Sequence, residues 1–188
     1  MVETLLKSRN IEEQTQFETN SIDIIRAITK DIRQREIERR IGLNYSKIQK
    51  EIAKGERHDP LLGSCYKNAC TLARRLKQHG FEPHLIWGMI APSEHIDIPN
   101  SVKDINSYIH FWVEVNPERE NLDKDKYVIA EIAKETKGGW HVTTTLPTHY
   151  HRLNGSRIRY DDAIMDLSIE SPTMDDYDKF KNEGLIVE

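Results

Sequence analysis

The chain has 188 residues, of which 37% are hydrophobic and 31% are charged. This length and composition predict one globular domain with a well-solvated surface, and they exclude a disordered or fibrous chain. The formal net charge of −4 excludes a protein whose whole surface binds nucleic acid, while a local basic patch is still compatible with it.

The N-terminal third is predicted to be helical. Residues 1–19 are polar and show no period, so we expect a loose arm there. Apolar residues then recur at helical spacing from Ser21 onward, and again toward Gly42 and toward Gly55. The first of these patterns comprises Ile24, Ile25, Ile28 and Ile32.

The middle of the chain predicts one further helix followed by strands. Cys65, Ala69, Leu72, Ala73 and Leu76 form a single apolar stripe, and we expect this helix to end near Gly80. Strand-like runs follow in PHLIWGMI, YIHFWVEV, YVIAEIA, GGWHVTTTL and RIRYDDAIMDLSI. Helices followed by strands predict an α+β fold in which the cysteine helix packs on an antiparallel sheet.

Three segments follow from this pattern. We interpret residues 1–57 as an N-terminal arm with helices, part of the core or appended to it, and residues 58–170 as the core itself. Residues 171–188 form an acidic tail, and MDDYDKFKNEG within it predicts a short helix with Thr173 as its cap.

The two cysteines have different places in the predicted helix. Cys65 lies in its first turn, where unpaired backbone N–H groups and the positive end of the helix dipole favour a thiolate over a thiol. Those N–H groups can also hold the oxyanion that forms when a thiolate attacks a carbonyl. Cys70 lies mid-helix and has neither advantage. The alternative is that Cys65 has a purely structural role as a small apolar residue.

A histidine and a carboxylate can complete a nucleophilic site. In HFWVEV, strand alternation places His110 with Trp112 and Glu114 on one face of the sheet. If a hairpin pairs Val115 with Lys126, Glu131 stands directly opposite His110, close enough to orient the ring. The alternative is a histidine and a glutamate on a solvated face.

These residues resemble a known family. The helix pattern that starts at Cys65 and the H-x-W-V-E-V of His110–Val115 are similar to the transglutaminase-like superfamily, relatives of papain-like enzymes. The likeness covers about half the chain, roughly 61–133, and rests on Cys65, Ala69, Leu72, Leu76, Gly80, Pro83, Ile86 and Gly88 together with the histidine motif.

The resemblance implies a catalytic triad of Cys65, His110 and an acid on a neighbouring strand. The family's acid is usually an aspartate soon after the histidine strand, whereas the hairpin position here holds Glu131. Asp166, in AIMDLSI, looks more like the family's acid in local sequence but lies much farther along the chain. Both candidates are kept. The implied activity is cleavage or transfer of an acyl group at a peptide or isopeptide bond, with a protein or peptide substrate.

Other patterns point elsewhere. The residue pattern of a DNA-binding helix-turn-helix is present in QREIERRIGLNYSKIQKEI. A nucleic acid could therefore contact the Arg33–Lys50 region, although acidic residues interrupt this basic patch. The second functional hypothesis is therefore an inactive transglutaminase-like binding module that contacts DNA or a protein through its N-terminal helices.

We expect no metal, cofactor or membrane partner. C-x4-C is not a zinc-ligand spacing, and His149 and His151 lack an evident third ligand. No apolar run approaches the roughly 18 residues of a membrane span, and the N-terminus lacks the apolar stretch of a signal peptide, which predicts a cytoplasmic protein.

Overall fold

The fold was taken from a computed structural model, which describes residues 20–40, 42, 50, 53–54, 61, 64–90, 109–117, 127–132, 142–146, 150–158 and 172–187. An N-terminal helix occupies residues 20–40. The elements after it are α2 (Cys65–Gln78), β1 (Pro83–Ile90), β2 (Ile109–Val115), β3 (Val128–Ala130), β4 (Val142–Thr143), β5 (Tyr150–Ile158), α4 (Met174–Asn182) and β6 (Ile186–Val187). The predicted α+β class is confirmed.

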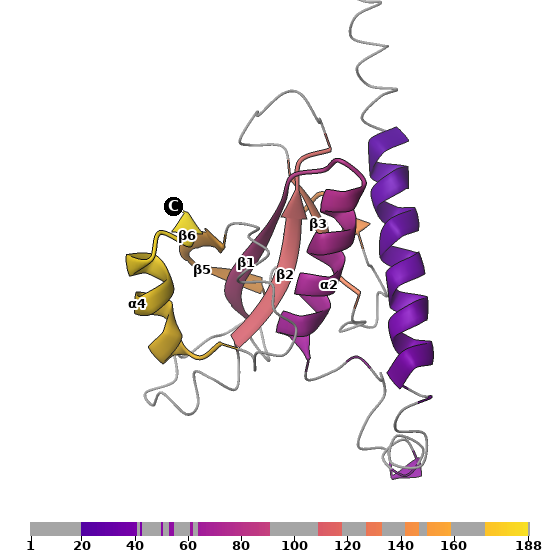
Figure 1. The fold of residues 1–188 in the computed structure, drawn as a ribbon, viewed down its shortest axis with the longest axis horizontal. Helices are drawn as coiled ribbons and strands as arrows, with labels where there is room; N and C mark the ends of the chain where they lie inside the picture. The colour runs from indigo at the N-terminus through magenta and orange to yellow at the C-terminus, as the bar shows by residue number, and fades with distance from the viewer. Residues whose placement is uncertain are drawn as a thin grey trace, which may run out of the picture.

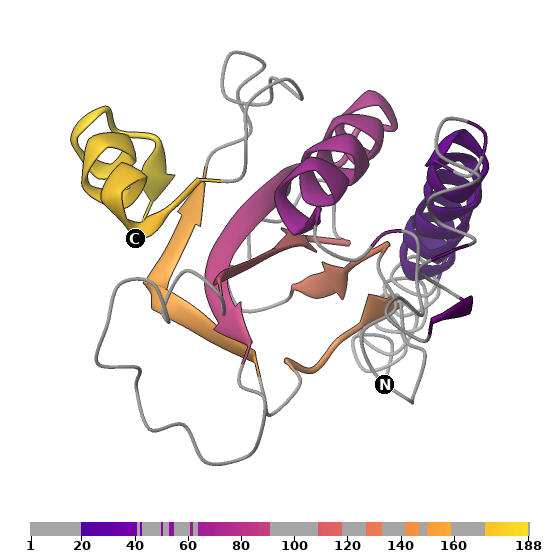
Figure 2. The ribbon, with the colours of Figure 1, turned by 90° about the horizontal axis from the view of Figure 1, so that it is seen from below.

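The strands form one antiparallel six-stranded sheet in the order β4-β3-β2-β1-β5-β6. The helix α2 lies along this sheet, as predicted, with the N-terminal helix beside it and α4 at the end near β5 and β6 (Figures 1 and 2). All three helices contribute to one apolar cluster with the sheet, so they cover the same face.

The apolar stripe of α2 fills the centre of that cluster. Leu72, Ala73 and Leu76 are completely buried, and from β2 the alternate residues Phe111 and Val113 meet them. Burying a leucine-sized side chain stabilises a fold by roughly 1.5–3 kcal/mol, so this stripe is what holds the helix on the sheet.

The N-terminal helix continues through the first two apolar patterns without a break before residue 40. Ile25, Ile28 and Ile32 are buried against α2 and the sheet, whereas Ile24 is 41% exposed, because it points away from the stripe. Of the third pattern, residues 50 and 53 are helical. The expected arm at residues 1–19 lies outside the described residues.

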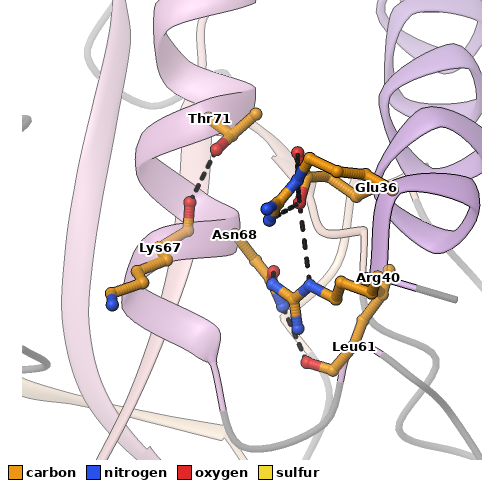
Figure 3. A network of polar contacts seen from close by, with 7 residues as sticks. Glu36, Arg40, Leu61, Lys67, Asn68 and Thr71 are labelled. Carbon is orange, nitrogen blue, oxygen red and sulfur yellow. Dashed lines mark hydrogen bonds and ion pairs between the residues drawn. The ribbon is translucent and has the colours of Figure 1, made fainter. Parts of the chain in front are cut away.

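A polar network joins the N-terminal helix to the start of α2 (Figure 3). The guanidinium of Arg40 donates to Asn68 Oδ1 at 2.6 Å, and Asn68 Nδ2 donates to the Leu61 carbonyl at 2.9 Å. Arg40 also lies 3.6 Å from the Glu36 carboxylate. Because Asn68 is buried and stands three residues after Cys65, these contacts fix the turn of α2 that carries the thiol.

The predicted C-terminal strands need correction. The last long strand, β5, begins at Tyr150, seven residues before the predicted RIRYDDAIMDLSI, because its first residues pair with Ile90 and Met89 of β1. Most of RIRYDDAIMDLSI lies outside the described residues. From GGWHVTTTL the structure shows the short β4, and it adds β6, which was not predicted. The acidic helix is α4, and Thr173 and Asp176 form a capping box at its start.

Candidate active site

The second face of the sheet buries polar groups. On β2, Phe111 and Val113 belong to the apolar cluster under the helices, while Trp112 belongs to a separate cluster on the opposite face. His110 is 4% exposed and Glu131, the residue after β3, is 5% exposed. The predicted alternation on β2 is therefore confirmed, whereas the solvated-face alternative for these two residues is wrong.

The structure brings His110 and Glu131 into direct contact. The Nε2 atom of His110 lies 2.8 Å from Glu131 Oε1, within ion-pair distance. The predicted register is wrong by two residues, because Val115 pairs with Val128 and not with Lys126. Val115 and Val128 are both buried, so this register pairs two apolar side chains in the core. Since a two-residue shift preserves the face, Glu131 still reaches the ring, but along a diagonal.

Aromatic rings hold the imidazole. The Trp112 ring stacks beside His110 with a centroid distance of 6.1 Å and an interplanar angle of 24°. Tyr150 meets His110 edge-on at 5.3 Å. Gly88, which pairs with His110 across β1, leaves room for Trp112, because a Cβ there would stand 2.2 Å from the indole. The rings restrict the orientation of the imidazole from two sides.

A second buried carboxylate lies farther along the same face. Glu114 is completely buried, and its Oε1 accepts hydrogen bonds from Arg152 Nε at 2.8 Å and from Trp112 Nε1 at 3.3 Å. Arg157 lies 3.7 Å from its other oxygen. Glu114 is thus the charge partner of two arginines, and it anchors the indole that stacks on His110.

Cys65 is the first residue of α2 and is half-buried. Its Sγ lies 4.0 Å from the carbonyl oxygen of Ile109, the residue before His110. Peptide geometry then puts the sulfur within about 7 Å of the His110 Cα. Because α2 covers the face that His110 points away from, the structure brings the thiol to the backbone at the start of β2 and not onto the imidazole's own face.

At the start of α2, neither a side-chain cap from Ser64 nor an acidic residue of the first turn offsets the positive end of the helix dipole. Its N-cap residue, Ser64, makes no side-chain cap hydrogen bond, and no acidic residue stands in the first turn. The N–H groups at this helix end therefore have no side-chain cap from Ser64 and no carboxylate of the first turn beside them, an arrangement suited to negative charge.

Cys70 has the opposite environment. It is completely buried in the middle of α2, and burial raises the pKa of its thiol to about 12. A thiol held neutral at physiological pH is not a nucleophile, which argues against a catalytic role for Cys70.

Two predicted residues lie outside the described part of the chain, namely Asp166 and His149. His151 is exposed on β5, and within the described segments no group of three or more His, Cys, Asp or Glu side chains is placed to hold a metal ion.

Sequence reasoning missed Tyr150. Its hydroxyl donates a hydrogen bond of 2.9 Å to Glu131 Oε2. No local pattern could have found this contact, because it depends on a register shift between β1 and β5 that lies between Ile86 and Gly88. Such irregularities bend a strand and re-aim its side chains.

Among the helices that the structure describes, none combines the length and the apolar character needed to cross a bilayer. No known protein family matches the chain, and neither the curated proteins nor the solved structures contain a match to it.

Proposed function

We propose that this protein is a transglutaminase-like cysteine enzyme that cleaves or transfers an acyl group at an amide bond. The observation that carries the proposal is the buried contact between His110 and Glu131. The residue before His110, Ile109, has its carbonyl oxygen 4.0 Å from the Cys65 sulfur. A buried imidazole paired with a carboxylate, next in the chain to the backbone that a helix-start thiol contacts, supports a role in thiol activation.

The reaction begins with proton transfer. In the proposed mechanism the ring carries a proton on Nε2, the nitrogen that lies 2.8 Å from Glu131 Oε1, and Nδ1 acts as the base. Nδ1 is the ring nitrogen nearer the backbone, and the backbone at Ile109 is where Cys65 approaches. Because Cys65 lies on the helix face of the sheet, the proton has to pass around the start of β2 to reach Nδ1 of His110, and Glu131 then stabilises the imidazolium.

The Cys65 thiolate then attacks the carbonyl carbon of the substrate amide. The oxyanion is held by the N–H groups at the start of α2, and His110 returns its proton to the leaving amine as the C–N bond breaks. A thioester on Cys65 remains, and water or an amine attacks it to release the acid or a new amide. We favour hydrolysis of a peptide or isopeptide bond.

Alkylation of the native protein tests the proposal. Iodoacetamide labelling between pH 5 and 9, read by peptide mass spectrometry, should modify Cys65 and spare Cys70, whose buried thiol is an internal reference. At pH 6 Cys65 should react faster than a free thiol of ordinary pKa, about 8.5, and p-nitrophenyl acetate should leave an acetyl group on it. His110→Gln should remove both effects; equal rates in the variant and the parent protein would refute the proposal.

One observation favours a second function. Because His110 points to the face opposite α2, the same fold also suits an inactive binding module. Arginines of the N-terminal helix are engaged with neighbours, Arg35 with Asp31 and Arg39 with Glu36, so such a module would use those side chains less freely. A Cys65→Ala variant that keeps its cellular role would favour this module over the enzyme.

A further inference from the structure

Glu131 needs two partners, because both of its carboxylate oxygens are inside the protein. One oxygen, Oε1, lies 2.8 Å from His110 Nε2, and the other, Oε2, accepts the Tyr150 hydroxyl at 2.9 Å. Burying a carboxylate without partners is costly, so an oxygen left without a partner would favour rotation of the side chain. The imidazole supplies an ion-pair contact to Oε1, and the Tyr150 hydroxyl supplies the hydrogen bond to Oε2.

Tyr150 is buried, like Glu131, and its ring is packed between aromatic side chains. It is 2% exposed, and its ring packs at 5.3 Å against both His110 and Trp112. The strand that carries it joins the sheet on the far side of β1, and the register shift in the β1–β5 pairing allows its first residue to reach the His110 face. The register shift thus places the Tyr150 hydroxyl where it can orient the buried Glu131 carboxylate.

We infer that Tyr150 is a positioning residue: its hydroxyl fixes the Glu131 carboxylate so that Oε1 stays on His110 Nε2. This inference rests on the proposed function, which it extends by a fourth residue. Tyr150 acts through Glu131 and does not touch the reacting atoms.

The test is a double-mutant cycle on the full chain. Tyr150→Phe keeps the ring wall and removes only the hydroxyl, and it should slow alkylation of Cys65 at pH 6 by roughly tenfold. In a Glu131→Gln background the same change should have no further effect, because the residue acts through the carboxylate. Two independent tenfold losses would overturn the inference.

The chain offers a matched control in Tyr127→Phe. The Tyr127 hydroxyl accepts a hydrogen bond from Arg157 at 2.7 Å, on the same face of the sheet but away from Glu131. This variant loses the same atom, and its Cys65 should react at the parental rate. Equal losses in the two tyrosine variants would show a general structural effect and would overturn the inference.

A spectroscopic measurement separates this inference from the proposed function. The Nε2–H proton of His110, assigned by its loss in His110→Gln, should exchange with water at least tenfold faster in Tyr150→Phe than in the parent protein or in Tyr127→Phe. If Cys65 proves unreactive but this exchange still responds, the enzyme proposal fails and the positioning role stands. Unchanged exchange together with a reactive Cys65 overturns the positioning role alone.

Failure to fold would also be informative. If Tyr150→Phe does not fold because it leaves a buried oxygen of Glu131 unsatisfied, Glu131→Gln should restore folding to the double variant. A double variant that stays unfolded contradicts the inference.

Discussion

The two faces of the sheet are buried to the same depth but hold different chemistry. Phe111 is 1% exposed on one face, and His110, the next residue back, is 4% exposed on the other. The face under the helices gains free energy from apolar contact, whereas the opposite face must satisfy His110, Glu114 and Glu131 with specific partners. The contrast teaches that stability and chemistry are carried by alternate residues of one strand, so each can be changed separately.

The largest expected effect is on the apolar face. Leu72→Ala removes a completely buried side chain from the stripe of α2 and should lower the free energy of unfolding by about 2–5 kcal/mol. Urea unfolding measures this loss. The alkylation rate of Cys65, corrected for the unfolded fraction, should stay at the parental value. A specific loss of reactivity would show that the two faces are not independent.

Gly88→Ala tests the opposite face. The added Cβ would stand 2.2 Å from the Trp112 indole and 2.5 Å from the His151 carbonyl oxygen, so the fold should lose about 1–3 kcal/mol. Because the indole stacks on His110, alkylation of folded Cys65 should slow by roughly tenfold or more.

The matched control for Gly88→Ala is Gly42→Ala. Gly42 is helical and has nothing within 4 Å of a new Cβ, so its variant should keep the parental reactivity and gain up to about 1 kcal/mol of stability. If the two glycine variants behave alike, the close approach of Trp112 has no role in the site.

The smallest effect concerns pH. Burial and, next, the charge of Arg157 lower the pKa of His84 from its ordinary value of 6.5. The unfolded chain therefore binds more protons near and below pH 6.5, so stability from the neutral His84 is fully present above that pH and declines as pH falls toward the folded pKa. Urea unfolding at pH 7.5 and 5.5 should show a larger loss for the parent than for His84→Gln. Equal losses would contradict a half-buried, neutral His84.

Much of the helical and central strand structure followed from local patterns. The stripe from Cys65 to Leu76 and the alternation in HFWVEV each indicate the face on which a residue lies, because side-chain periods of 3.6 and 2 are properties of the backbone itself. The β2–β3 pairing was predicted two residues out, and β5 was placed too late, because pairing depends on loops and partner strands that no local window contains.

What the sequence by itself determined is the class of the fold, the face on which each residue of α2 and β2 lies, and the place of Cys65 at a helix start. Only the tertiary structure decided that His110 contacts Glu131 along a diagonal and that the Tyr150 hydroxyl donates a hydrogen bond to Glu131. It also decided that the Cys65 thiol lies on the helix face of the sheet, opposite the imidazole. The physical reason is that periodicity is a local constraint on the chain, whereas contacts between strands are set by register, twist and bulges, which arise only when distant segments compete to pack.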